Sequence, residues 1–568
     1  MHDAVKFRCS ERFSMFSLAV LVPWLPCLVQ VFSQPIQQPF SVRPSSPKLH
    51  GRFLHITDMH PDPHYIAGAS ESSACHRKKP RKEKARSGYY GTPFGDCDSP
   101  LRLTNLTLDF LDKNWASEID FVVWTGDNAR HDNDRKIPRT PKEIFDLNSM
   151  LAREMENIFI KKGIPVVPSL GNNDIWPHNI LPAGPNDIID HFSSIWSAFV
   201  PLSSYQVFRR GAYYAVEVIS GEVAVISLNT MYFYDSNKAV GGCEYREPDD
   251  PGNLEFDWLE VQLKVFRQRG MQVWITGHVP PSPGNYFPEC YVRYVELSLR
   301  FQDTILGHLF GHMNNDHFFL LEAGDLEFPS KSDLAPASDT VESEGHDGLY
   351  DSLINDFGDL PKKGKTDHDN YGVVNISPSV VPNPYLPSFR IYTYNITNNR
   401  NDVKKKKRKH GHRRGAGDKV KLCKKKKYKN SWRCKLDKAW HSDPDAPSRM
   451  NTLWSPLGYA QYYLPEDRLL NRTKKPKFKL EYLTHRLGAL HPGDVERRDE
   501  FRYPIPLKQL PKSIREGNGT STSSKFAPYG MEDLTIPSWV GLARRLGDPS
   551  RKKLRRRFKR YMYMGEKS

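Results

Sequence analysis

The sequence has 568 residues, a net charge of +16 and a pI near 9.2. The excess of Lys and Arg is concentrated in two segments, and the chain contains no internal repeat. These features exclude a repeat protein and a uniformly basic surface, and they indicate one enzyme domain with basic segments attached.

The first predicted element is a hydrophobic run at 13–32, which has the length of roughly 20 residues that spans a bilayer. Basic side chains precede this run within residues 1–12, which we expect to form a short cytosolic N-terminus. Pro23 and Pro26 interrupt the run, so a cleaved signal peptide is the alternative. We favour an uncleaved transmembrane signal-anchor, which would place the rest of the chain in the lumen of the secretory pathway.

Five short apolar runs follow, and a motif of Asp, Asn or His residues ends each of them. The runs are 53–57, 121–125, 166–170, 273–276 and 305–310, and the motifs after them are Asp58-Met59-His60, Gly126-Asp127-Asn128, Gly171-Asn172-Asn173-Asp174, Gly277-His278 and Gly311-His312-Met313-Asn314. Each run has the length of a strand and no polar alternation. This pattern is typical of a sheet buried on both faces, whose strand ends would bring the motifs into one shared crevice.

The residue types in these motifs are those of a site for two metal ions. Two divalent cations about 3.5–4 Å apart require a bridging carboxylate and several neutral imidazole or amide ligands, and Asp127 is the natural bridge. Mixed nitrogen and oxygen ligands favour zinc, manganese or iron over calcium, which takes only oxygen ligands. Such a pair of ions lowers the pKa of a bound water and binds both oxygens of a phosphoester or phosphoanhydride during cleavage.

In order and in residue type, the five motifs resemble those of the calcineurin-like metallophosphoesterases. The resemblance implies an α/β fold in which two packed mixed sheets form an αββα sandwich flanked by helices. The implied ligands are Asp58, His60 and Asp127 for the first metal, and Asp127, Asn172, His278 and His312 for the second. Gly307-His308 offers a second register for the last motif, but Met313-Asn314 continues the family pattern only after His312.

Two positions depart from the usual family pattern. Asn314 stands where the family usually has a second His, and its amide oxygen is a harder and weaker ligand than imidazole. We therefore expect the first metal site to prefer manganese, magnesium or cobalt over zinc. Asn173 stands at the usual position of a catalytic His, and because an amide cannot donate a proton as an acid, another residue must do so.

His131 is the candidate for this acid. It lies four residues after Asp127, and the acid sphingomyelinase branch of the superfamily has a His at that offset. A general acid contributes about 10²–10⁴-fold to a rate. The alternative is that His131 only caps a loop. Arg130 is predicted to contact substrate, where it could stabilise the transferred phosphoryl group.

The remaining segments are predicted to surround this site. We place the metallophosphoesterase core at 50–325, with a helix at 141–162 that covers the sheet. Residues 326–370 are acidic and polar, and we expect a disordered insertion. Alternating strands at 371–400 are expected to complete the second sheet. The C-terminal region, 436–568, contains aromatic and Pro-rich phrases and ends in a basic tail.

The two basic segments lie in the second half of the chain. The first is a polybasic segment at 401–435, which has fifteen Lys and Arg but one acidic residue between 404 and 429, and the second is at 551–560. A nuclear-targeting or solvated run is the alternative, but nuclear targeting conflicts with the hydrophobic N-terminal run. Both segments would attract a linear polyanion through counterion release. The predicted substrate-binding positions here are Lys404, Lys405, Lys424 and Lys425.

Glycosylation motifs and cysteines support a lumenal location. Five sequons follow the hydrophobic run, at Asn105, Asn375, Asn395, Asn471 and Asn518. Six cysteines also follow it, and pairing in sequence order would join Cys75 to Cys97, Cys243 to Cys290, and Cys423 to Cys434. Other connectivities, or six buried thiols, are the alternatives.

More closely, the sequence resembles the fungal vacuolar endopolyphosphatases. The resemblance lies in the phrase from Phe53 to Tyr65, in Gly171-Asn172-Asn173-Asp174, and in Gly311-His312-Met313-Asn314 with Asp316-His317-Phe318. It implies metal-dependent cleavage of phosphoanhydride bonds within inorganic polyphosphate, and a single-pass type II anchor in the vacuole membrane. We expect two divalent ions (manganese, magnesium, cobalt or zinc) and no nucleic-acid partner. A homo-oligomer is left open. An acid-sphingomyelinase-like phosphodiesterase, or a non-catalytic polyanion-binding membrane protein with a decayed metal site, is the alternative.

Overall fold

The computed structural model describes residues 49–77, 86–328, 347–397, 422–426, 428–436, 439–473, 475–490, 504–515 and 524–564. All of them belong to one compact unit, Arg43–Ser568. The hydrophobic run at 13–32 lies outside these residues, and within them no helix is long and apolar enough to cross a membrane. The predicted membrane anchor therefore stays a prediction.

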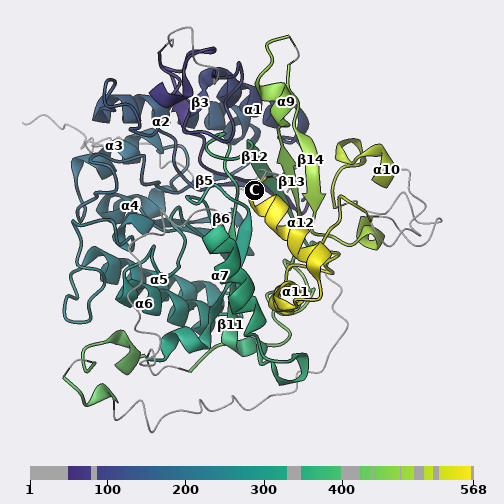
Figure 1. The fold of residues 1–568 in the computed structure, drawn as a ribbon. Helices are drawn as coiled ribbons and strands as arrows, with labels where there is room; N and C mark the ends of the chain where they lie inside the picture. Colours follow the sequence, from purple (N-terminus) through teal and green to yellow (C-terminus); the bar gives the residue numbers. More distant parts are fainter. Residues whose placement is uncertain are drawn as a thin grey trace, which may run out of the picture. The chain divides into compact units, whose positions relative to one another are not determined.

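Two six-stranded mixed sheets form the centre of the fold (Figure 1). In order, the first contains β14 (Lys479–Leu483), β13 (Pro456–Tyr463), β12 (Ser388–Tyr394), β1 (Arg52–Ile56), β4 (Phe121–Trp124) and β5 (Val166–Pro168). The second contains β10 (His317–Glu322), β11 (Tyr371–Ile376), β9 (Ile305–Phe310), β8 (Gln272–Thr276), β7 (Val223–Ser227) and β6 (Tyr214–Ile219). A small third sheet pairs β2 (Pro61–Asp62) with β3 (Ser99–Pro100).

The five predicted apolar runs coincide with β1, β4, β5, β8 and β9. These strands have almost no exposed residue, because helices cover the outer face of each sheet and the other sheet covers its inner face. The strands do not form one sheet, however. Three of them lie in parallel in the first sheet, and β8 and β9 lie in parallel in the second. The motifs therefore meet where the ends of two sheets come together.

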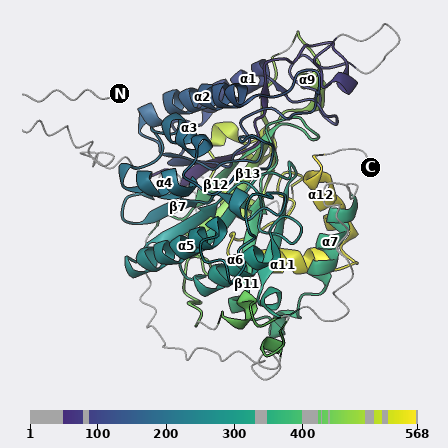
Figure 2. The ribbon, with the colours of Figure 1, turned by 90° about the vertical axis from the view of Figure 1, so that its left-hand side faces the viewer.

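The inner faces of the two sheets pack directly on each other. The Phe53 ring of β1 lies 5.1 Å from the Trp274 ring of β8. At the edge, the hydroxyl of Ser227 donates a hydrogen bond to the carbonyl oxygen of Pro168 at 2.8 Å. Figure 2 shows α1 (Leu101–Asn114) and α2 (Pro141–Ile158) outside the first sheet, and α5 (Pro251–Gln268) and α6 (Pro288–Arg300) outside the second. The order of layers is the predicted αββα sandwich.

Helix α2 illustrates how the sequence determines an element. Thr140 caps its N-terminus by accepting a hydrogen bond from the backbone N of Glu143, and Pro141 occupies the first turn. Apolar residues at helical spacing, including Leu151 and Met155, are fully buried, and each contributes roughly 1.5–3 kcal/mol relative to exposure. The helix predicted at 141–162 is confirmed, with a short 3-10 turn over its last residues, Ile160–Lys162.

Shorter helices and the C-terminal region complete the unit. The other α-helices of the described residues are α3 (Asp187–Ile195), α4 (Tyr205–Gly211), α7 (Asp347–Gly358), α9 (Glu466–Leu469), α10 (Lys512–Arg515), α11 (Ile536–Gly547) and α12 (Lys552–Met562). Two strands of the C-terminal region, β13 and β14, extend the first sheet. The predicted strands at 371–400 divide between the sheets, because β11 joins the second as expected but β12 joins the first.

The acidic segment at 326–370 is partly ordered, contrary to the prediction. Residues 347–358 form α7, whose apolar side chains Leu353, Ile354 and Phe357 are buried. These three residues supply a helical apolar face that the acidic composition of the segment concealed. The prediction of disorder is therefore wrong for this part, and residues 329–346 lie outside the described residues.

The structure contains the three disulfides expected from pairing in sequence order. They join Cys75 to Cys97, Cys243 to Cys290, and Cys423 to Cys434. The sequons differ in accessibility: Asn105 and Asn471 are exposed, Asn395 is half-buried, and Asn518 lies outside the described residues. Asn375 is 4% exposed within β11, so its predicted glycosylation is wrong for the folded chain.

Candidate metal centre

The motif residues of both sheets converge on the carboxylate of Asp127. Its Oδ2 atom lies 3.3 Å from Nε2 of His60 and 3.2 Å from Nε2 of His278. Burial raises the pKa of Asp127, but the neighbouring His278 and His60 lower it more, so the pKa is well below its ordinary value. An ionised carboxylate between two imidazoles is the arrangement that a bridging ligand requires.

The first group of ligand atoms belongs to Asp58, His60 and Asp127. One ligand atom from each lies within 4.8 Å of the others. Nδ1 of His60 is hydrogen-bonded to the carbonyl oxygen of Ala129 at 2.8 Å, which leaves Nε2 facing the cluster. Among the described residues, neither this Nε2 nor Oδ1 of Asp58 has a hydrogen-bond partner, although both are buried. Buried polar atoms without partners are costly, so this group fits a cation.

The second group lies around the side-chain oxygen of Asn172. This Oδ1 atom is 2.8 Å from Nε2 of His278 and 3.0 Å from Nδ1 of His312. The other ring nitrogen of His278 is hydrogen-bonded to the carbonyl oxygen of Thr125 at 2.7 Å, and Nδ2 of Asn172 donates to Oδ1 of Asn179 at 2.9 Å. These outer contacts orient His278 and Asn172, and His312 completes a group of three predicted ligands whose donor atoms lie together.

The side chain of Asn314 is fixed through its nitrogen. Its Nδ2 donates a hydrogen bond to the carbonyl oxygen of Asn383 at 2.9 Å, while its buried Oδ1 has no partner among the described residues. The backbone φ of Asn314 is +56°, in the left-handed region that Asn tolerates better than most residues. The hydrogen bond from Nδ2 therefore orients the amide, and Oδ1 is left without a hydrogen-bond partner among the described residues.

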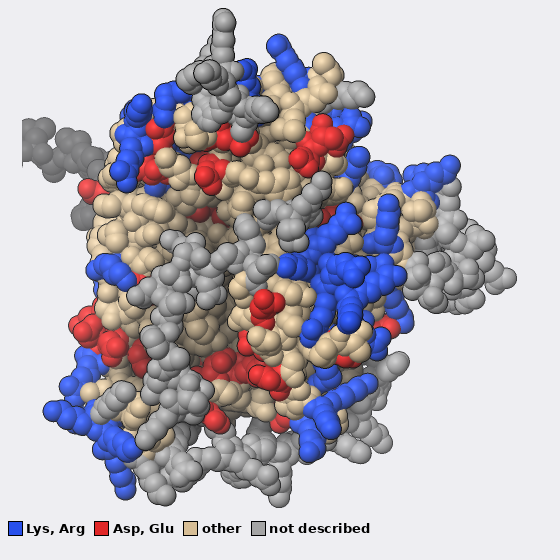
Figure 3. Space-filling model, viewed as in Figure 1, with Lys and Arg blue, Asp and Glu red and all other residues tan. Residues whose placement is uncertain are grey.

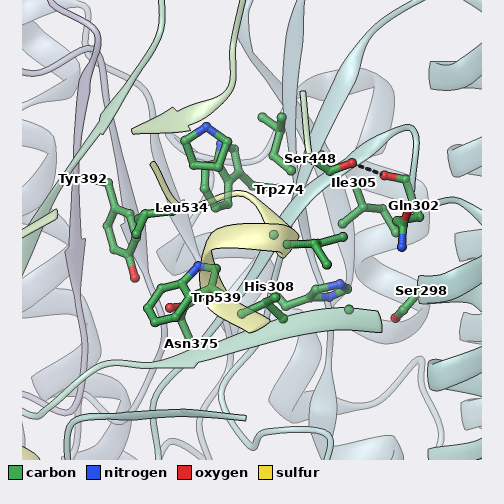
Figure 4. A pocket seen from close by; sticks show the side chains of 16 residues that line it. Trp274, Ser298, Gln302, Ile305, His308, Asn375, Tyr392, Ser448, Leu534 and Trp539 are labelled. Carbon is green, nitrogen blue, oxygen red and sulfur yellow. Dashed lines mark hydrogen bonds between the residues drawn. The ribbon is translucent and has the colours of Figure 1, made fainter. Parts of the chain in front are cut away.

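The register of the last motif is decided in favour of His312. His308 lies on β9 with its Nδ1 2.7 Å from the hydroxyl of Tyr294, and it does not contact the ligand groups. Figure 4 shows His308 with Trp539 and Asn375 at a separate internal cavity of about 20 Å³, room for roughly one water molecule. His308 is a core residue rather than a ligand.

Glycines let the motifs approach one another. A Cβ atom on Gly171 would lie 2.2 Å from Oδ1 of Asp127, and one on Gly311 would lie 2.5 Å from Oδ2 of Asp58. Asp58 and Asp127 also have positive φ values, +50° and +58°. Such backbone conformations cost roughly 1–3 kcal/mol each and are typical of functional sites.

His131 lies beside the first ligand group. Its ring stacks on the ring of His60 with centroids 4.0 Å apart, and its side chain is 23% exposed. Nδ1 of His131 is 2.7 Å from Oδ1 of Asp98, and its backbone N donates to Oδ2 of Asp98 at 2.6 Å. The bond to Asp98 leaves Nε2 as the ring atom that can exchange a proton with a substrate.

The two other predicted catalytic or substrate-contacting residues have different roles. Asn173 donates from Nδ2 to Oδ2 of Asp127 at 2.9 Å and from its backbone N to Oδ1 at 2.8 Å, so it orients the bridging carboxylate. Arg130 is 1% exposed, and its guanidinium donates to Glu143 and to two backbone carbonyls. The structure therefore does not support the prediction that Arg130 contacts the phosphoryl group, because its guanidinium is buried and donates to Glu143 and the backbone.

Two carboxylates of the site were missed by sequence reasoning. Asp98 follows Cys97 in an irregular loop and has no local motif. Asp174 belongs to a recognised motif but had no assigned role, and it accepts hydrogen bonds from the backbone N of Asp127, Asn128 and Gly171. Burial, together with the charge of Asp127, raises the pKa of Asp174 to about 6. Through these hydrogen bonds, the Asp174 side chain links the turn after β4 to the turn after β5.

The predicted substrate lysines are only partly described. Lys424 and Lys425 are exposed near the Cys423–Cys434 disulfide, whereas Lys404 and Lys405 lie outside the described residues. Trp432, within the same disulfide loop, donates from Nε1 to the carbonyl oxygen of Cys243 at 2.7 Å. The end of the polybasic segment is thereby attached to the core beside α6.

The sandwich and its buried His–Asp centre define a calcineurin-like phosphoesterase, and a family model described as calcineurin-like phosphoesterase matches residues 51–316. Several curated proteins named endopolyphosphatase are similar to this chain. The one from Cryptococcus neoformans is 40% identical over 88% of this chain and 89% of its own length. Those from Neurospora crassa and Saccharomyces cerevisiae are 33% and 32% identical, over 92% and 88% of this chain and 81% and 83% of theirs. The chain belongs to the endopolyphosphatase family.

Proposed function

We propose that this protein hydrolyses phosphoanhydride bonds within inorganic polyphosphate and requires divalent metal ions to do so. The observation that carries the proposal is the convergence of two ligand groups on Asp127, in a chain whose relatives are named endopolyphosphatase. The same observation argues against a decayed site, because the buried ligand atoms Oδ1 of Asp58 and Nε2 of His60 are present and form no hydrogen bond among the described residues.

The donor set fits two divalent cations. Asp58, His60, Asp127 and Asn314 would hold the first, and Asp127, Asn172, His278 and His312 the second. Such a pair supplies an activated water and neutralises charge on the oxygens of the bond being cleaved. Because imidazole, carboxylate and amide donors are mixed, and Asn314 replaces an imidazole, we propose that manganese, magnesium or cobalt supports activity better than zinc.

The chain's own residues orient the bridging carboxylate and protonate the leaving group. Asn173 and Asp174 hold the bridging carboxylate and the turns on either side of it. Asp98 holds the ring of His131 by Nδ1, so Nε2 is the atom that delivers a proton to the leaving phosphate oxygen. Disulfide Cys75–Cys97 ends next to Asp98 and fixes the position of the loop that carries it.

We also propose that the run at 13–32 anchors this unit in the lumen of the vacuole as a type II membrane protein. Three disulfides support an oxidising compartment, and the exposed sequons Asn105 and Asn471 support glycosylation there. Digestion of the full chain with a glycosidase in sealed vacuoles tests this, and loss of the glycan shift only after the membrane is opened is the expected result. A chain without glycan would contradict it.

The test of the activity is a gel assay on long polyphosphate with the full chain, after chelation and with manganese, magnesium, cobalt or zinc restored. We expect chains to shorten through intermediate lengths only when metal returns, and Asp127→Asn to abolish the shortening. Asp187→Asn, an exposed carboxylate on α3, is the matched control and should behave as the wild type. Release of phosphate without chains of intermediate length would indicate attack at the chain ends. Cleavage of phosphodiesters but not of polyphosphate would show that the substrate is a phosphodiester.

A further inference from the structure

A stripe of cations runs along α12 and is not part of the metal centre. Lys553, Arg556, Arg557 and Arg560 follow the spacing i, i+3, i+4, i+7, which places them on one helix face, here named the α12 stripe. Three of them are exposed and Arg557 is half-buried. Figure 3 shows blue Lys and Arg atoms gathered over this helix. Within the described part of the chain, none of the four forms an ion pair.

The opposite face of α12 is fixed to the core. Phe558 and Met562 are buried, and the Phe558 ring lies 6.1 Å from the ring of Phe318. Arg555 donates to the carbonyl oxygens of Leu546 and Gly547, the last residues of α11, at 2.6 and 2.7 Å. The stripe therefore has a defined orientation. Because the apolar face is used in packing, it is not free to insert into a membrane, as an interfacial helix would.

The C-terminal end of α12 lies next to the segments that position Asn314. The carbonyl oxygen of Met562 accepts a hydrogen bond from the backbone N of Asp316 at 3.1 Å. The ring of Tyr563 lies 5.7 Å from that of Tyr385, two residues after Asn383, whose carbonyl accepts from Asn314. The C-terminal end of the stripe, with Arg560 in the last turn of α12, therefore lies on the side of the helix that contacts Asp316, two residues after Asn314.

We propose that the α12 stripe binds linear polyphosphate outside the metal centre and leads it to that centre from the C-terminal end of the helix, an inference that rests on the proposed function. The eight residues from Lys553 to Arg560 extend about 10 Å along the helix. Polyphosphate carries negative charge on every internal unit and has no base or sugar, so a row of cations suffices to recognise it. Arg side chains add bidentate hydrogen bonds to phosphoryl oxygens.

The test is the affinity of the full chain for fluorescent long polyphosphate, measured with chelator present so that nothing is cleaved. The variant Lys553→Gln/Arg556→Gln/Arg560→Gln should bind about tenfold more weakly at low salt. Its slope of log Kd against log salt should fall by about 2, since each phosphate contact contributes roughly 0.7. Unchanged affinity and slope would overturn the proposal.

The matched control is Lys264→Gln/Arg267→Gln/Arg269→Gln, which removes three charges near the start of β8, at the end of the sheet away from the ligand motifs. The polybasic segment is intact in both variants, so their difference reports the stripe. Equal weakening in both would mean that only net charge matters, and would refute the proposal.

A second measurement uses the unmodified protein and does not depend on how a variant folds. Bound polyphosphate should slow the acetylation of Lys553 severalfold, as measured by mass spectrometry, and should leave the acetylation of Lys264 unchanged. An equal effect of polyphosphate on both lysines would contradict binding at the α12 stripe. Vesicles of phosphatidylserine and phosphatidylcholine are tested in parallel, and binding of vesicles but not polyphosphate through the stripe would assign it to lipid. Failure of the proposed function would appear separately, as wild-type protein that shortens no polyphosphate with any metal.

Discussion

Asp98 holds His131 through two hydrogen bonds, one from the ring Nδ1 at 2.7 Å and one from the backbone N at 2.6 Å. Burial raises the pKa of Asp98, but the charge of His131 and its hydrogen bonds lower it more, and the net shift is downward. An ionised Asp98 can only accept, so Nδ1 must carry the proton of this bond. One carboxylate thus sets both the tautomer and the orientation of a ring stacked on His60.

Replacing Asp98 should therefore impair turnover without removing metal. We expect Asp98→Asn to lower kcat about 10–100-fold, the usual cost of losing an orienting carboxylate, and His131→Ala to lower it about 10²–10⁴-fold. Metal content by mass spectrometry should stay at the wild-type value in both. A variant that loses metal together with activity would show that Asp98 supports His60 instead.

The Cys75–Cys97 disulfide should matter for activity as well as stability. Removing it as Cys75→Ser/Cys97→Ser should lower the free energy of unfolding by about 2–4 kcal/mol and also lower kcat, because Cys97 precedes Asp98. The matched variant Cys423→Ser/Cys434→Ser breaks a disulfide whose residues do not contact the ligand groups. It should retain wild-type kcat on long polyphosphate, and an equal loss in both variants would argue against this role of the first disulfide.

Asn314 should determine the metal preference. The substitution Asn314→His supplies an imidazole at a left-handed backbone position that His also tolerates, so the fold should not change. We expect zinc-supported turnover to rise relative to manganese-supported turnover, because imidazole binds zinc more strongly than an amide oxygen does. Turnover measured on the chelated and reloaded enzyme tests this, and an unchanged ratio would contradict it.

Gly171 should be essential for the bridging ligand. In Gly171→Ala the new Cβ would lie 2.2 Å from Oδ1 and 2.3 Å from the backbone N of Asp127, so Asp127 must move. We expect fewer than two metal ions per chain by mass spectrometry. Gly324→Ala adds the same methyl group where no atom lies within 4 Å, and it should bind metal normally. Full metal content in the Gly171 variant would show that the turn can relax.

Glu481 should make stability depend on pH. Desolvation, with a further contribution from Asp316, raises the pKa of Glu481 to about 8, although its hydrogen bond from Gln461 opposes the shift. The folded chain then keeps a proton that the unfolded chain releases above its ordinary pKa of 4.5. Stability from this group is therefore complete below that pKa and is lost as the pH rises toward 8.

Differential scanning calorimetry at about pH 5 and about pH 8 tests this linkage. The melting temperature of Glu481→Gln should fall less between the two pH values than that of the wild type, since Gln preserves the shape without the titration. Glu466→Gln, an exposed position at the start of α9, is the control and should follow the wild type. Equal falls in the wild type and in Glu481→Gln would show that Glu481 titrates normally.

Local patterns in the sequence determined the strands, the ligands and one long helix. The apolar runs before Asp58 and His312 coincide with β1 and β9, because a strand covered on both faces must be apolar at every position. The capping residue Thr140 and the apolar period after it defined α2 in the same way. The metal ligands could be recognised in the sequence because metal chemistry restricts them to a few types of side chain.

Only the tertiary structure decided how these pieces meet. The strands that carry the motifs divide between two sheets, Asn375 is buried by its neighbours, and Arg130 is bonded to Glu143 rather than to substrate. The bond from His131 to Asp98 joins residues 33 positions apart, and no local pattern encodes such a contact. The physical reason is that apolar period, capping and ligand type act within a few residues, whereas burial and hydrogen-bond partners depend on which distant segments pack together.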